Sequence, residues 1–208
     1  MPDKNNFDLV APYYDRLVRL VFGKSMIQAQ TYFLKKIAPG SSVLVLGGGT
    51  GLWLNHLLSL NPGCKIIFID SSEKMIEQAK RFTNNSSRID FRLGNENSMN
   101  ADDQFDVVVA YCYLDLFSDN LLPEIISKIR NKTSNGAQWI VVDFVSTSWW
   151  HSAMIFIMYS FFRITAGLAN GKLPDWEQIL KQSNLTRVEE KFFYAGIIKS
   201  AVFVDSGS

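Results

Sequence analysis

The sequence predicts an α/β protein with a doubly wound, mostly parallel seven-stranded sheet that ends in a C-terminal antiparallel hairpin. Three observations predict this class. Short apolar, β-rich runs alternate with segments of helical hydrophobic spacing, as in parallel sheets. The last two β-rich runs have no helix between them, and the 208 residues contain no internal repeat or long linker. A chain of this length buries a sufficient core as one unit, so we expect a single domain over 1–208.

The N-terminal half alternates between helix and strand patterns. Apolar residues three or four positions apart indicate helices, and short apolar runs between polar residues or glycines indicate buried strands. Gly23 and the pair Pro39-Gly40 are typical helix breakers. The predicted elements are helices over 7–21 and 27–37, a strand over 43–46, a helix over 52–60, a strand over 65–69, and a helix capped by Ser71 or Ser72.

The C-terminal half continues this alternation as far as Phe144 and then departs from it. The predicted elements are strands over 89–93 and 105–110, a helix over 121–129, a strand over 139–144, a helix that begins at Pro174-Asp175, and two β-rich runs over 186–194 and 197–204. The last two runs meet at Ala195-Gly196, and this junction predicts the terminal hairpin.

Charge and cysteine content argue against several classes of function. With 21 basic and 20 acidic side chains the net charge is +1, so the chain lacks the positive charge on which sequence-independent nucleic-acid binding depends. Two cysteines and two histidines do not have the spacing of a zinc or iron–sulfur site, and we expect no bound metal. The first residues lack the apolar core of a secretory signal, which favours a cytoplasmic protein.

The strand over 43–46 runs through the glycine-rich sequence VLVLGGGTG directly into a helix. In an open parallel sheet this is where the cofactor crevice lies. Gly47, Gly48, Gly49 and Gly51 let the backbone approach a ligand, and the exposed amides of the next helix favour an anionic group. Asp70 lies 19 residues beyond Gly51 at the end of the next strand, where a carboxylate accepts both ribose hydroxyls of an adenosine. The pattern predicts a nucleoside derivative as the ligand.

The spacing of Gly47, Gly49 and Gly51 differs from the dinucleotide fingerprint Gly-x-Gly-x-x-Gly, because position 52 is Leu. This argues against a nicotinamide cofactor. The chain instead resembles the class I S-adenosylmethionine-dependent methyltransferases in VLVLGGGTG, in IIFIDSS, and in LGNENS and FDVVVAYCYLDLF at the places of later motifs. The opening segment FDLVAPYYDRL and the closing strand pair are similar to the ubiquinone and menaquinone biosynthesis methyltransferase branch.

The resemblance implies S-adenosylmethionine as the cofactor and a Rossmann-like methyltransferase fold. The residues that it implies around the cofactor are Gly47, Gly48, Gly49 and Gly51 at the methionine part, Asp70 on the ribose with Ser71 beside it, Asn95 and Glu96 near the adenine, the backbone of Ala110 and Tyr111 facing the methionine amino group, and Tyr14 closing the pocket. Val45 stands where the family usually has an acid, and Asn95 where it often has Asp. We expect backbone carbonyls and water to hold the cofactor's ammonium end instead.

The resemblance also implies in-line methyl transfer to a small, hydrophobic acceptor such as a quinone precursor or a lipid-like molecule. Holding the acceptor at near-attack distance supplies much of the acceleration, and a base is needed only where a proton must leave. The catalytic candidates are His151, Tyr14 and Asp115, and the residues expected to contact the acceptor are Tyr113, Asp115, Trp149 and Trp150. A packed or surface position for His151 and a loop-capping position for Asp115 remain open alternatives.

An apolar stretch without Asp, Glu, Lys or Arg runs from Phe144 to Phe162. The stretch is long enough to suggest a membrane-spanning helix. A span at this place is disfavoured, because it would put strands of one sheet on opposite sides of the membrane. The other interpretations are a core helix, a lid over a lipophilic acceptor, and a face that dips into a membrane interface, where Trp and Tyr act as anchors. We favour a helical lid over 145–184, with the helices over 1–38 also covering the site. Peripheral membrane contact stays open.

Two other functions remain open from the sequence. A protein of the same fold would bind a nucleoside or a lipid without catalysing transfer, and Val45 together with the lack of an obvious base suits that alternative. An NAD(P)-dependent oxidoreductase is the other alternative, against which the glycine spacing argues.

Overall fold

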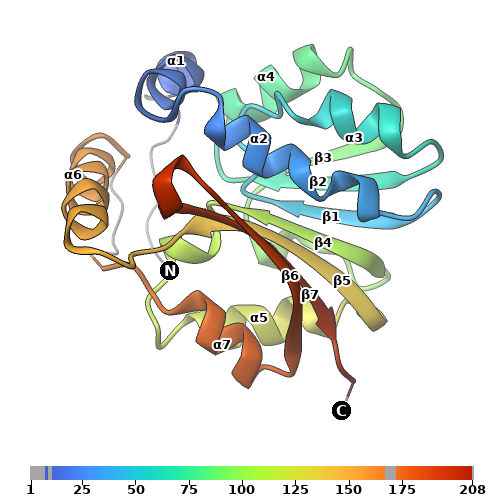
Figure 1. Cartoon of the computed structure of the whole chain (residues 1–208). Coiled ribbons are helices and arrows are strands. Elements are labelled where there is room, and N and C mark those ends of the chain that lie inside the picture. The colour runs from blue at the N-terminus through green and yellow to red at the C-terminus, as the bar shows by residue number, and fades with distance from the viewer. Residues whose placement is uncertain (1–7, 9–10, 167–171, 208) are drawn as a thin grey trace.

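The structure, a computed structural model, describes residues 8, 11–166 and 172–207. Its centre is a seven-stranded sheet with the order β3-β2-β1-β4-β5-β7-β6 (Figure 1). The strands are β1 (Ser42–Leu46), β2 (Lys65–Asp70), β3 (Ile89–Leu93), β4 (Phe105–Tyr111), β5 (Thr133–Phe144), β6 (Leu185–Phe193) and β7 (Ile198–Asp205). The first five strands pair in parallel, and β7 pairs antiparallel with both β5 and β6. The predicted fold class, including the terminal hairpin, is confirmed.

The helices are α1 (Ala11–Phe22), α2 (Ser25–Tyr32), α3 (Leu54–Leu60), α4 (Glu73–Phe82), α5 (Leu122–Arg130), α6 (Trp149–Ala166) and α7 (Trp176–Gln182). Because successive strand residues face opposite sides, Val43 and Val45 join an apolar cluster with α2, α3 and α4, whereas Leu44 and Leu46 join a second cluster with α5 and α7. Figure 1 shows these two helical layers on opposite faces of the sheet. The sheet is therefore buried between them.

Two helices lie outside this sandwich. Figure 1 shows α1 and α6 beyond one end of the sheet. This is the carboxyl end of β5, because α6 begins at Trp149, shortly after β5 ends at Phe144. Strand β1 has β2 on one side and β4 on the other, and such a change of direction in the strand order opens a crevice at the carboxyl ends. Helices α1 and α6 thus stand over the place where the crevice is expected.

Several element boundaries differ from the prediction. The start of the first predicted helix, at Phe7, lies outside the described residues. The second helix ends at Tyr32 and is followed by a 3₁₀ turn over Leu34–Lys36, which brings Leu34 into the core. Strand β5 begins at Thr133, earlier than predicted. Its first residues are polar, so the apolar pattern did not reveal them, and they pair with β4 across a register shift. The Ser72 hydroxyl accepts the Met75 N–H at 3.1 Å, so Ser72 is the cap of α4.

The apolar stretch forms α6, a single helix with two unlike sides. Ile155 and Tyr159 are buried against the body of the protein, whereas Trp149, Phe156 and Ile157 are 83%, 67% and 69% exposed. None of the helices within the described ranges is long and apolar enough to cross a membrane. The helix is thus only partly covered by the rest of the chain.

Candidate functional site

In the loop after β1, Gly47 and Gly49 serve different purposes. Gly47 has a φ of +66°, and a Cβ there would lie 2.8 Å from the carbonyl oxygen of Tyr111. Gly49 has a φ of +58°, but a Cβ there would meet only the ring of Tyr14, at 3.8 Å. Left-handed backbone is costly for any residue with a Cβ. Gly47 therefore allows close packing against β4, whereas Gly49 keeps the space beneath Tyr14 open.

Asp70, at the end of β2, faces this loop. Its Oδ2 accepts the Gly49 N–H at 3.1 Å and its Oδ1 accepts the Ser72 N–H at 3.0 Å. Burial raises the pKa of Asp70 to about 6, although the Ser72 and Gly49 N–H groups pull it down. Each carboxylate oxygen can accept a second hydrogen bond. The side chain therefore joins the glycine loop to the start of α4 and retains capacity to accept hydroxyl groups.

The residues after β3 and β4 meet beside this carboxylate. The Asn95 side chain accepts the Asn97 N–H at 3.0 Å and caps a short 3₁₀ turn over Glu96–Ser98. Glu96 is buried, and its Oε2 accepts the Tyr113 hydroxyl at 2.8 Å. A Cβ on Gly47 would lie 3.0 Å from the Cβ of Tyr113. Tyr113, expected at the acceptor, thus lies between the glycine loop and Glu96.

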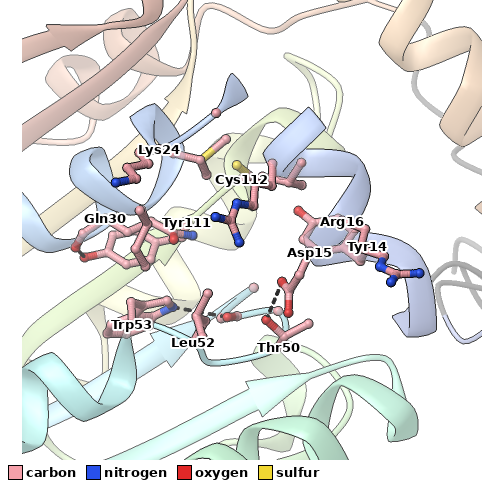
Figure 2. Close-up of a pocket in the computed structure, with 18 residues that line it drawn as sticks. Tyr14, Asp15, Arg16, Lys24, Gln30, Thr50, Leu52, Trp53, Tyr111 and Cys112 are labelled. Atoms are coloured by element: carbon pink, nitrogen blue, oxygen red, sulfur yellow. Dashed lines mark hydrogen bonds between the residues drawn. The ribbon is translucent and has the colours of Figure 1, made fainter. Parts of the chain in front are cut away.

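Two cavities open above the strand ends. The first, here called the glycine-loop cavity, has a volume of about 360 Å³ and lies between α1 and the glycine loop (Figure 2). Gly47, Gly48 and Gly49 line it, together with Tyr111. The second, here called the apolar cavity, has a volume of about 450 Å³ and lies between α1 and α6. Both volumes are in the range of small-molecule sites.

The two cavities share part of their walls. Tyr14, Val18, Met26 and Cys112 line both of them. Cys112 directly follows β4 with a φ of +46°, a conformation that is uncommon for a residue other than glycine. Burial raises the pKa of the Cys112 thiol and of the Tyr14 hydroxyl well above their usual values. At neutral pH the shared wall is therefore uncharged, and ligands in the two cavities would meet there.

A pair of buried carboxyl groups lies at the floor of the apolar cavity. Asp115 lines the cavity and is 3% exposed, and Asp143 lies behind it in β5 with no exposure. The Oδ2 of Asp143 accepts the Asp115 backbone N–H at 3.2 Å, and the Tyr159 hydroxyl of α6 donates to Asp115 Oδ2 at 3.2 Å. Burial raises the pKa of Asp115 to about 7. Burial also raises the pKa of Asp143 well above its usual value, and the nearby charge of Asp115 raises it further.

The remaining predicted residues are not among those that line the two cavities. His151 is buried on α6, with Nε2 3.2 Å from the carbonyl oxygen of Ala195 and Nδ1 3.2 Å from the Thr147 nitrogen. Trp149 is exposed, and Trp150 packs edge-on against His151. Neither tryptophan is among the residues that line the two cavities. Also outside the two linings are Tyr113, predicted to contact the acceptor, and Gly51, Asp70, Ser71, Asn95, Glu96 and Ala110.

Sequence reasoning missed several residues of the site. Asp15 and Cys112 lie inside the segments FDLVAPYYDRL and FDVVVAYCYLDLF but were given no role, whereas Asp143 and Tyr159 lie in no motif. Asp143 and Tyr159 are far from Asp115 in the sequence and meet it only through the packing of β5 and α6. A hydrophobic pattern cannot reveal such a cluster, since its members belong to different elements.

Comparison with known proteins gives one match to a family model and one to a curated protein. Residues 43–136 match the family model described as a methyltransferase domain. A segment of 66 residues is 39% identical to an uncharacterized 37.1 kDa protein in transposon TN4556 of Streptomyces fradiae, and it covers 31% of this chain. The match spans 19% of that protein's length.

Solved methyltransferase structures share the fold over most of the chain. A chain from the complex between the Haloferax volcanii Trm112 methyltransferase activator and a methyltransferase has a TM-score of 0.75 and 14% identity, covering 98% of this chain and 99% of that one. The N-methyltransferase NodS from Bradyrhizobium japonicum WM9, solved with S-adenosyl-L-homocysteine, has a TM-score of 0.63 and 17% identity, with 86% of each chain covered. The mitomycin 7-O-methyltransferase MmcR has a TM-score of 0.68 and 15% identity, covering 92% and 57%. At these identities the likeness establishes the fold alone.

Proposed function

We propose that this chain, which contains a class I S-adenosylmethionine-dependent methyltransferase domain, transfers a methyl group to a small, hydrophobic acceptor such as a quinone precursor or a lipid-like molecule. One observation carries this proposal: the glycine-loop cavity and the apolar cavity meet at four shared residues, Tyr14, Val18, Met26 and Cys112. A donor in one and an acceptor in the other would come into contact there. Such positioning is the main requirement of an in-line displacement.

The glycine loop and its neighbours suit the donor. The loop provides left-handed glycines and an open space at Gly49, the cradle that a bulky ligand needs. Asp70 accepts the ribose hydroxyls, and the turn at Asn95 and Glu96 lies on the adenine side. When bound, S-adenosylmethionine supplies an electrophilic methyl carbon on a sulfonium. Tyr14 covers the loop and excludes water from the shared wall.

The apolar cavity suits the acceptor. Its lining is made mainly of apolar side chains from α1 and α6, among them Leu17, Phe22 and Met154. Among the described residues that line it, Asp115 is the acidic one. Methionine and aromatic side chains adapt to apolar ligands of varied shape. We assign Asp115 the role of accepting the proton that leaves a hydroxyl or enol-like acceptor. A base with a pKa near 7 is well matched to proton transfer at neutral pH.

The test of this function is transfer of a labelled methyl group from S-adenosylmethionine into a lipid extract of cells. We expect a labelled product that partitions into organic solvent. Asp115→Asn should lower the rate by about 10²- to 10⁴-fold and leave the affinity for S-adenosylhomocysteine unchanged. The wild-type rate should fall as the pH drops below about 7, because Asp115 must be ionised to accept a proton. Binding of the cofactor product without any transfer would contradict the proposal.

Peripheral contact with a membrane is a further part of the proposal. Val21 of α1 and Ile157 of α6 both line the apolar cavity, and they are 38% and 69% exposed. The mouth of the cavity is therefore continuous with exposed apolar surface, and their chain neighbours Phe156 and Leu20 are exposed as well. A lipophilic acceptor would enter the cavity from the membrane interface. Wild-type protein should sediment with phospholipid vesicles and Ile157→Asp should not; equal sedimentation of both proteins would contradict the contact.

A further inference from the structure

The charged groups of the glycine-loop cavity bear on how the donor is held. The methionine part of S-adenosylmethionine carries an ammonium and a carboxylate, and both groups need partners when they leave water. On β1, Val45 is fully buried and offers no charge. A Cβ on Gly48 would lie 2.9 Å from the Val45 side chain, so this strand end is filled by apolar packing. Any charged partner for the ammonium would therefore come from another element.

Helix α1 provides a carboxylate at this place. Among the described residues that line the glycine-loop cavity, Asp15 is the acidic one. The Thr50 hydroxyl, in the glycine loop, donates to Asp15 Oδ1 at 2.8 Å, and Thr50 itself is 4% exposed. Figure 2 shows Asp15 extending from α1 toward Thr50 at the glycine loop. The hydrogen bond fixes one oxygen of Asp15 and holds the carboxylate against the cavity.

The surroundings of Asp15 favour a cationic ligand. The side chain is half-buried, and burial raises its pKa above the usual value, although the Thr50 hydroxyl lowers it. A carboxylate that has lost part of its hydration gains most from a positive charge at short range. Arg16, Arg19 and Lys24 line the same cavity. One wall therefore carries both signs of charge, which matches a ligand end with both an ammonium and a carboxylate.

We infer that Asp15 receives the α-ammonium of the methionine part of S-adenosylmethionine, and that Thr50 positions the Asp15 carboxylate for this contact. The basic side chains of α1 and the α1–α2 turn then face the α-carboxylate. The inference rests on the proposed function, because it concerns the same donor site. It adds a binding residue from outside the glycine loop, and it makes donor binding depend on the position of α1.

The experiment compares two ligands that differ only in this end of the molecule. S-Adenosylhomocysteine carries the ammonium and the carboxylate, whereas 5′-methylthioadenosine carries neither. Calorimetric titration of wild type, Asp15→Asn and the exposed control Asp102→Asn gives the affinity for each ligand. Asp15→Asn should weaken S-adenosylhomocysteine about ten- to 150-fold, the range for one hydrogen bond to a charged group. The affinity for 5′-methylthioadenosine should change less than threefold, and Asp102→Asn should match wild type.

The outcomes separate this inference from the proposed function. Equal weakening of both ligands by Asp15→Asn would show a structural role only and overturn the inference, as would unchanged affinity for S-adenosylhomocysteine. In both cases binding of the ligands to wild type would leave the proposed function standing. Wild-type protein that binds neither ligand would overturn both. Thr50→Val keeps the carboxylate and removes its hydrogen bond, so it should weaken S-adenosylhomocysteine less than Asp15→Asn does.

Discussion

Replacement of Asp70 by Asn tests the donor site most directly, since it removes one charge with little change of shape. Both carboxylate oxygens accept backbone N–H groups, from Gly49 at 3.1 Å and from Ser72 at 3.0 Å. An amide has one oxygen and one NH₂ group. In Asp70→Asn one of the two backbone donors must therefore face another donor, and one ribose hydroxyl loses its acceptor.

The expected size of the effect follows from these contacts. One hydrogen bond to a charged acceptor contributes about 1.5 to 3 kcal/mol. Its loss corresponds to an affinity about ten- to 150-fold lower for S-adenosylhomocysteine. In the proposed donor site the ribose hydroxyls donate to the ionised carboxylate, so wild-type affinity should also fall as the pH drops below about 6, by up to tenfold per pH unit. Asp70→Asn should lack this dependence.

Calorimetric titration at several pH values between 5 and 8 checks both expectations, with thermal unfolding as the control for folding. The effect on stability has the opposite sign. The pKa of Asp70 is raised in the fold, so its ionisation costs stability above about pH 6 and that cost disappears as the pH falls toward 4. Wild-type affinity that stays constant from pH 8 to pH 5, or an Asp70→Asn variant that binds as tightly as wild type, would refute the assignment of Asp70 to the ribose.

Two further predictions separate the site from its surroundings. Gly49→Val should abolish detectable S-adenosylhomocysteine binding, because it strains the backbone and fills the space beneath Tyr14; Gly136→Val, where φ is +75° and the space is open, carries similar strain and should keep binding. Equal loss of binding in both variants would contradict this role of Gly49. His151→Ala should lower the free energy of unfolding by about 1 kcal/mol through its lost bond to the Ala195 carbonyl, measured by urea denaturation, and leave the transfer rate within threefold. A hundredfold slower enzyme with unchanged stability would instead place His151 in catalysis.

The hydrophobic pattern was sufficient to predict the succession of strands and helices along the chain. Buried parallel strands are short and apolar on both faces, so β1, β2 and β4 stand out from the helices between them. The sequence also predicted the glycine loop and Asp70 as parts of the site, because their chemistry depends on spacing along the chain. The predicted boundaries of the elements were less accurate where backbone pairing rather than apolar burial decides them. One example is the polar start of β5, which pairs with β4 across a register shift.

The sequence by itself determined the fold class, the glycine loop and the aspartate that follows the second strand, since each depends on residues close to one another in the chain. Only the tertiary structure decided which residues form the walls of the two cavities. Asp15 reaches the glycine loop from α1, and Asp115, Asp143 and Tyr159 meet at the ends of different elements. Such meetings depend on how helices and strands pack across the sheet, and a one-dimensional pattern carries no record of that packing.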